Sequence, residues 1–350
     1  MRIRRIAVIA AAGAGLAWLA TGAASAQTRS FTDAAGRRVQ VPTRASRVIA
    51  AGPPAAILIY TVAPETLLGW TRPLSEAERA YLPPRYGRLP VLGRLTGRAN
   101  TANVEAVLAA KPDLIIDVGA VNATYASVAD RVQEQTGIPF VLLDGRFDST
   151  AATIRAAADL LGRSDRGAEL AAYAERTLAE IRGRIAAIPG SHRPRVYYGR
   201  GATGLETGLG GSINVEMLEF LGARNVAAEA GAGSLAQVSI EQVLAWDPDV
   251  VLTTDRAFAA SVATSPVWQG LRAVKSGGFH LSPAAPFPWF DVPPSVNRLI
   301  GARWAASVLY PAAFPEDLRA ITRDFCRRFY HLDLSDRQID ALVGPPAKRP

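Results

Sequence analysis

Two stretches of the chain, residues 103–117 and 239–253, repeat one pattern of hydrophobic and polar positions. Each starts with apolar residues three and four positions apart, as in a short helix, and passes through Pro-Asp into a run of Leu, Ile and Val. The proline is expected to end the helix, because it lacks an N–H group. The apolar run is typical of a parallel strand that is buried on both faces. Since a glutamate and the Pro-Asp pair fall in register in both copies, we infer a duplication and two α/β lobes of one design.

The rest of the chain alternates between strand and helix patterns in the same way, which is typical of βαβ units and a mostly parallel sheet. The predicted strands are 31–42 (two short pieces around a turn), 47–51, 67–70, 140–143, 195–198 and 279–281. The predicted helices include 55–62, 125–135, 217–221 and 297–309, and residues 314–330 are expected to pack the tail.

One long helix is predicted at 165–188, where apolar residues recur at helical spacing between charged ones until Pro189-Gly190. A helix of this length can cross from one lobe to another. We therefore predict an α/β fold of two Rossmann-like lobes with mostly parallel sheets, joined by this helix. The predicted divisions are an N-terminal lobe at 27–163, a linking helix at 164–190, a C-terminal lobe at 191–334 and a tail at 335–350.

The first 26 residues have the pattern of a cleavable signal peptide. Three arginines precede an apolar stretch at 6–20, and Ala24-Ser25-Ala26 is a small-residue cleavage pattern before Gln27. The apolar stretch is shorter than the roughly 20 residues that favour a spanning helix, although a retained membrane anchor is the alternative. The single cysteine, Cys326, excludes a disulfide framework and lies too far from the cleavage site to carry a lipid. We expect an exported, periplasmic, monomeric product in which Cys326 is a buried thiol.

Charge and motifs argue against several classes of function. The formal net charge is +8, three of these charges lie in the leader, and no basic stripe with interleaved aromatic residues suggests a nucleic-acid partner. The three histidines have no zinc-binding spacing, and no Gly-x-Ser-x-Gly elbow is present. The Gly-x-Gly-x-x-Gly match at 199–204 is followed by a glycine-rich loop, so it is weak evidence for a dinucleotide. We expect neither a cofactor nor enzymatic activity.

Three features together resemble the periplasmic binding proteins of ATP-driven importers, in the branch that carries ferric siderophores, haem and cobalamin. These features are the segment from Phe31 to Val39, the repeated Glu and Pro-Asp units, and the long central helix. The resemblance implies a ligand cleft between the lobes and docking on an inner-membrane permease. In that family one glutamate per lobe meets arginines of the two permease subunits, and the matching residues here are Glu105 and Glu241. From the sequence alone, either could be an ordinary acid at a helix start.

Candidate cleft residues follow from the rule that open α/β sheets bind ligands at the carboxyl ends of their strands. The loop 286–295 carries a Trp where relatives place an aromatic cleft residue, and its Pro-Pro-Ser ending resembles a subset that includes molybdate or tungstate binders. Arginines suit anionic ligands, although each could be a surface residue and each aromatic residue could belong to the core. The candidates are Pro53, Arg94, Arg98, Tyr125, Tyr198, Arg200, Thr203, Trp289 and Phe290.

The sequence therefore predicts a protein that captures a metal chelate, of the ferric siderophore type or haem or cobalamin, and delivers it to an ATP-driven permease. One alternative is an oxyanion such as molybdate or tungstate in the same fold. The other alternative is a periplasmic enzyme or chaperone that acts on a metal complex.

Overall fold

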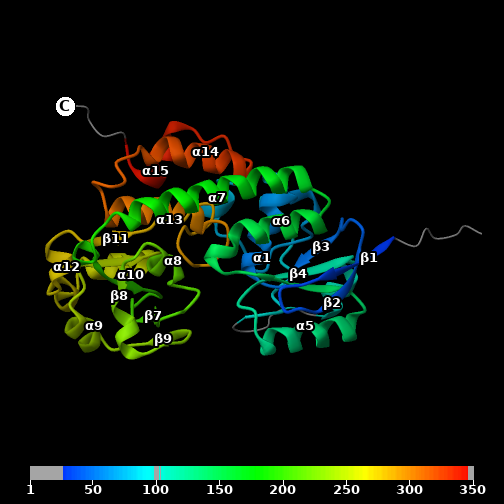
Figure 1. The fold of residues 1–350 in the computed structure, drawn as a ribbon, viewed down its shortest axis with the longest axis horizontal. Helices are drawn as coiled ribbons and strands as arrows, with labels where there is room; N and C mark the ends of the chain where they lie inside the picture. The colour runs from blue at the N-terminus through cyan, green and yellow to red at the C-terminus, as the bar shows by residue number, and fades with distance from the viewer. Residues whose placement is uncertain (1–26, 98–101, 103, 346–350) are drawn as a thin grey trace, which may run out of the picture.

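The computed structural model describes residues 27–97, 102 and 104–345. Two lobes lie side by side, and the long helix α7 (Ser164–Ala186) runs across both of them (Figure 1). This arrangement confirms the predicted α/β fold of two lobes with mostly parallel sheets. The exact domain boundaries stay predictions, as does the signal peptide, which lies outside the described residues.

Three parallel strands form the sheet of the N-terminal lobe, in the order β3 (Val48–Ala50), β4 (Leu114–Gly119) and β5 (Phe140–Asp144). Successive side chains of these strands enter two separate apolar clusters, one shared with α1 (Pro53–Val62) and α6 (Thr150–Leu160) and the other with α5 (Ala123–Thr136). The sheet is therefore covered on both faces, which explains why its strands read as unbroken apolar runs.

Four parallel strands form the sheet of the C-terminal lobe, in the order β11 (Phe279–Leu281), β10 (Val250–Thr253), β6 (Arg195–Gly199) and β8 (Arg224–Asn225). Tyr197 and Tyr198 are adjacent on β6 and belong to different apolar clusters, one on each face of the sheet. One face is covered by α8 (Glu216–Phe220) and α13 (Arg298–Leu309), and the other by α9 (Ile240–Trp246) and α10 (Arg256–Val262).

The remaining elements are short or peripheral. Two antiparallel strand pairs form separate two-stranded sheets, and the other helices lie outside the two parallel sheets. They are β1 (Thr28–Thr32) with β2 (Arg38–Pro42), β7 (Glu206–Gly208) with β9 (Leu235–Gln237), α2 (Glu76–Arg79), α3 (Pro84–Gly87), α4 (Val104–Ala109), α11 (Pro266–Gln269), α12 (Arg272–Lys275), α14 (Leu318–Tyr330), α15 (Asp336–Val343), and the 3-10 turns Pro64–Thr66, Phe147–Ser149, Gly190–His192 and Val226–Ala230.

The predicted repeat has the same local structure in both lobes. Lys111 and Asp247 occupy equivalent positions just before Pro-Asp, and both have a positive φ, 47° and 39°, that turns the chain out of the helix. The aspartate that follows each proline then holds the start of the neighbouring strand. Asp113 Oδ2 accepts from the main-chain N–H of Ser46 at 2.8 Å, and Asp249 Oδ2 accepts from that of Arg195 at 2.8 Å. The Pro-Asp pair therefore stops a helix and sets the strand register.

Helix α7 connects the lobes through its apolar stripe. Leu170, Ala174, Ile181 and Ile185 on this stripe are buried, and α7 packs against α6 of one lobe and α13 of the other. This confirms the predicted long helix, which ends at Ala186, four residues before the predicted boundary of the linking segment. Among the described residues, no helix combines the length and the apolar character that a membrane span requires.

The predicted strand at 67–70 is wrong. Leu67 and Trp70 each make one isolated bridge, to Val48 and Val91 respectively, and no continuous ladder forms. The extended segment is short, because a 3-10 turn ends at Thr66 and a proline follows at position 73. Proline has no N–H group to donate to a strand ladder. The segment contributes side chains to the core but no strand to the sheet.

Candidate ligand-binding cleft

A cavity of about 980 Å³ lies between the lobes. The N-terminal lobe contributes the start of α1 and the ends of β4 and β5, as expected for ligand sites of open α/β sheets. The C-terminal lobe contributes three loops, at residues 211–214, 233–235 and 291–294. Both lobes therefore form its walls.

Four arginines line this cleft: Arg72, Arg94, Arg146 and Arg200. The Arg146 side chain is 70% exposed, and its Nη2 pairs with Asp144 Oδ2 at 2.7 Å. The Arg200 side chain is only 13% exposed, because its Nε pairs with Asp291 Oδ2 at 2.9 Å and its Nη1 with Glu206. Both guanidinium groups are therefore paired with acids, but Arg146 is open to the cleft whereas Arg200 is largely enclosed.

The fully buried carboxylate of Asp291 orients this part of the C-terminal wall. It accepts hydrogen bonds from the Tyr198 hydroxyl and from Asn214 Nδ2, the latter at 2.7 Å. Burial raises the pKa of Asp291, although Arg200 beside it favours the ionised form. A buried carboxylate needs such partners, since an unpaired buried charge is strongly destabilising. Asp291 therefore positions Arg200 and Asn214 at the cleft.

A second buried carboxyl, that of Asp117, lies on the N-terminal wall in the carboxyl-terminal half of β4. Only 5% of Asp117 is exposed, and its Oδ1 accepts from the Val118 N–H at 3.0 Å. Burial raises the pKa of Asp117 to about 6, against hydrogen bonds from Thr96 and Val118 that lower it. This carboxyl group therefore changes its protonation between mildly acidic and neutral pH.

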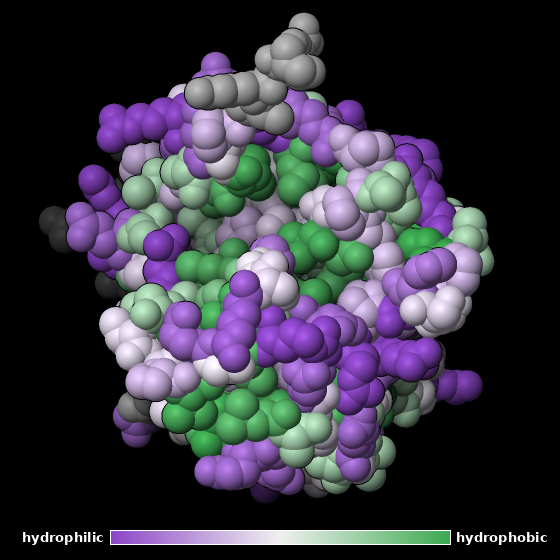
Figure 2. Space-filling model, turned by 90° about the vertical axis from the view of Figure 1, so that its left-hand side faces the viewer, coloured by the Kyte–Doolittle hydropathy of each residue, from purple (hydrophilic) through white to green (hydrophobic). Residues whose placement is uncertain are grey.

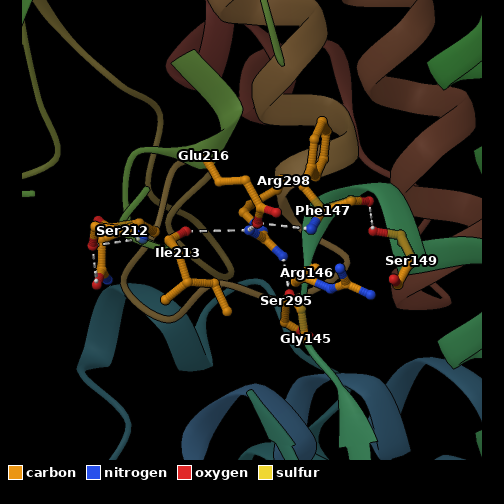
Figure 3. A network of polar contacts seen from close by, with 12 residues as sticks. Gly145, Arg146, Phe147, Ser149, Ser212, Ile213, Glu216, Ser295 and Arg298 are labelled. Carbon is orange, nitrogen blue, oxygen red and sulfur yellow. Dashed lines mark hydrogen bonds and ion pairs between the residues drawn. The ribbon is translucent and has the colours of Figure 1, made fainter. Parts of the chain in front are cut away.

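A network centred on Arg298 joins the lobes at the base of the cleft (Figure 3). Arg298 begins α13, is 2% exposed, and donates from Nη2 to the Gly145 carbonyl oxygen at 2.5 Å. Its Nη1 contacts Glu216 Oε2 at 3.2 Å, and the same oxygen accepts from the Phe147 N–H at 2.8 Å. Burial lowers the pKa of the guanidinium, with Glu216 opposing this shift. The loop after β5 is thereby fastened to the C-terminal lobe.

The structure separates the sequence-predicted site residues into three groups. Pro53, Arg94, Tyr125 and Arg200 line the cleft, and their contact with a ligand stays a prediction. Arg98 lies outside the described residues. The remaining four do not line the cleft: Tyr198, Thr203, Trp289 and Phe290.

The aromatic candidates are corrected to core residues. Trp289, Phe290 and Tyr198 are each fully buried. Phe290 stacks on Tyr198 with ring centroids 4.1 Å apart, and Tyr198 reaches the cleft only through its hydroxyl contact to Asp291. The loop turns Trp289 inward, and Asp291, Val292 and two prolines face the cavity instead. The hydrophobic effect explains this orientation of the loop. Burying the large aromatic rings removes more apolar surface from water than burying the neighbouring residues would.

Thr203 is corrected to an exposed turn residue. It belongs to the 199–204 glycine segment, which leads into β7 and opens no helix. A Cβ on Gly204, whose φ is +72°, would lie 2.2 Å from the Phe258 ring, so this glycine permits close packing. Cys326 is buried, as expected, and burial raises the pKa of its thiol to about 12.

Several cleft residues were missed at the sequence level: Arg72, Asp117, Arg146, Ser212, Asn214 and Asp291. The positions of Asp117 and Arg146, at or just beyond the ends of predicted strands, could have identified them as cleft residues. Asp291 lies two residues after the candidate Trp289. No feature of the surrounding sequence identifies Arg72 or Asn214 as cleft residues. Among the described residues, no cluster of three His, Cys, Asp or Glu side chains could hold a metal ion.

Comparison with known proteins places this cleft in a family. The sequence model described as periplasmic binding protein matches residues 77–285. This chain belongs to the periplasmic binding protein family. Members of this family bind small ligands and work with ABC permeases, so this periplasmic binding protein is a substrate-binding component and not an enzyme.

Relatives of this binding protein differ in the ligand that their names record. The molybdate-binding protein MolA of Haemophilus influenzae is 28% identical over 334 residues, covering 86% of this chain and 91% of MolA. A cobalamin-binding protein of Halobacterium salinarum is 30% identical over 281 residues, covering 73% of this chain and 69% of that protein. Among solved structures, an ABC transporter solute binding protein from Sulfurospirillum deleyianum has a TM-score of 0.80 and 29% identity, over 90% of this chain and 99% of that one.

Proposed function

We propose that this binding protein captures a metal chelate, of the ferric siderophore type or haem or cobalamin, and delivers it to an inner-membrane ATP-driven permease. The observation that carries the proposal is the cleft of about 980 Å³ with arginines on both walls. Ligand pockets commonly measure about 300–1,000 Å³, so this volume suits a bulky solute. Arg146 and Arg200 offer charged donors to the oxygens of such a chelate.

A second candidate ligand is a small oxyanion such as molybdate or tungstate. The similarity to MolA over most of both chains supports it. A tetrahedral oxyanion would fill only a small part of the cleft of about 980 Å³. For this reason we favour the larger ligand.

Delivery to the permease is assigned to Glu105 and Glu241. Both carboxylates are exposed in the first turns of equivalent helices, α4 and α9. Main-chain hydrogen bonding and the Ser239 hydroxyl lower the pKa of Glu241, so this group is charged at neutral pH. An exposed acid can pair with a permease arginine without a burial cost in the free protein.

Titration calorimetry of the mature protein tests the ligand proposal. The panel contains ferric hydroxamate and ferric catecholate chelates, haem, cobalamin, molybdate and tungstate. We expect stoichiometric binding of a chelate, with the ligand recovered unchanged afterwards. Tight binding of molybdate or tungstate alone would favour the oxyanion instead, and chemical conversion of a chelate would overturn the assignment as a binding protein.

A further inference from the structure

Two exposed leucines occupy equivalent positions in the two repeats. The exposed fraction is 43% for Leu108 on α4 and 40% for Leu244 on α9. Each follows one of the proposed docking glutamates, Glu105 or Glu241, by three positions. Residues three apart on a helix lie on the same side, so each lobe presents an acid beside a leucine.

The burial of the neighbouring valines shows that both helices face the same way. Val107 and Val243 are equivalent in the repeat, and they are 1% and 0% exposed. With these valines fixed in the core, Leu108 and Leu244 must point outward in both lobes. The shared exposure is therefore a property of the repeated unit and not of one irregular loop.

Single exposed apolar residues are ordinary on protein surfaces. Here, however, large apolar side chains recur at matching positions next to charged ones. Figure 2, which views the molecule from the side of the C-terminal lobe, shows apolar side chains gathered in patches among hydrophilic ones on this surface. A surface that combines a carboxylate and an apolar side chain complements an arginine that borders an apolar pocket.

We propose that each lobe docks on one permease subunit through a two-part contact. Glu105 or Glu241 pairs with an arginine, and Leu108 or Leu244 enters an apolar pocket beside it. The fitting partner is a permease with two equivalent subunits, each carrying this arginine and this pocket. The inference rests on the proposed delivery function and adds the leucines to it. The ion pairs set orientation, and leucine burial supplies affinity that salt does not screen.

The test measures the affinity of three variants for the native permease reconstituted in nanodiscs, at low and at high salt. Two of them are double variants and the third is a single-site control. The variants are Leu108→Ser with Leu244→Ser, Glu105→Ala with Glu241→Ala, and the control Leu281→Ser, a 36% exposed leucine on β11. Ligand titration and thermal melting on the same proteins check the cleft and the fold.

We expect the leucine pair to lose about tenfold in affinity per leucine, at both salt concentrations. The glutamate pair should lose affinity mainly at low salt, and the control should match wild type. If the leucine pair binds like wild type while the glutamate pair does not, this inference is overturned and the docking assignment stands. If neither pair changes binding, both are overturned.

Discussion

Arg298, in the C-terminal lobe, donates from Nη2 to the carbonyl oxygen of Gly145 in the N-terminal lobe at 2.5 Å. The guanidinium is buried, and its ion pair with Glu216 lies at the base of the ligand cleft. A buried charge with several fixed partners holds the segments around it in one arrangement. The relative position of the two cleft walls therefore depends on this residue.

Replacement of Arg298 by Met should destabilise the protein strongly. The substitution would leave Glu216 and the Gly145 carbonyl without their buried donor, a loss of about 3–5 kcal/mol in the free energy of unfolding. Chemical denaturation measures this difference. The matched control is Arg272→Met, because Arg272 is 54% exposed and pairs with Asp247 and Asp249 at the surface. The control should cost no more than about 1 kcal/mol, and equal losses would contradict the account of Arg298.

Much of the fold could be predicted because the repeated unit carries its own structural signals. The proline ends each helix, and Asp113 and Asp249 hold the adjacent strands, so local sequence determines local structure. The cleft was harder to predict, because burial of an aromatic ring and contact with a ligand select the same residue types. Trp289 and Asp291 lie on the same loop, yet the Trp289 ring is buried in the core and Asp291 lies at the cleft wall. The direction of each side chain there depends on packing between distant segments.

Replacement of Gly301 by Ala should destabilise the protein, because the added methyl group would clash with the loop 286–295. A Cβ at Gly301 would lie 1.7 Å from the Trp289 carbonyl oxygen, which is main chain and cannot rotate away. We expect a loss of about 1–3 kcal/mol or more, measured by thermal or chemical unfolding. Gly183→Ala in α7 is the control, since nothing lies within 4 Å of its added Cβ. There the helix should gain about 0.5–1 kcal/mol, and a stable Gly301 variant would show that the loop is free to move.

The stability of the protein should depend on the protonation of Asp117. Burial raises its pKa from an ordinary value of 3.8 to about 6, so the folded state keeps a proton that the unfolded state loses. The free energy of unfolding should therefore fall as pH rises from about 4 to about 6, by about 3 kcal/mol at most, and then stay level. Urea denaturation of the wild type and of Asp117→Asn across this range isolates the effect. An unchanged pH dependence in the variant would assign it to another group.

Replacement of Arg146 by Gln should weaken ligand binding without unfolding the protein. The side chain is exposed in the cleft, and loss of one charged donor to the oxygens of the chelate should lower affinity about tenfold. Calorimetry with the ferric chelate that wild type binds gives the measurement. Arg182→Gln is the control, because Arg182 is 59% exposed, pairs with Asp148 and does not line the cleft. Equal affinities of both variants would remove Arg146 from the site.

The most direct test of the account is to identify what the native protein carries. Protein isolated gently from its own periplasm should be examined by native mass spectrometry together with metal analysis. We expect one metal chelate per chain, retained without chemical change and lost when the cleft arginines are replaced. A protein that retains molybdate or tungstate would contradict the chelate assignment, and one that retains nothing and binds none of the candidate ligands would contradict the proposed function of the cleft.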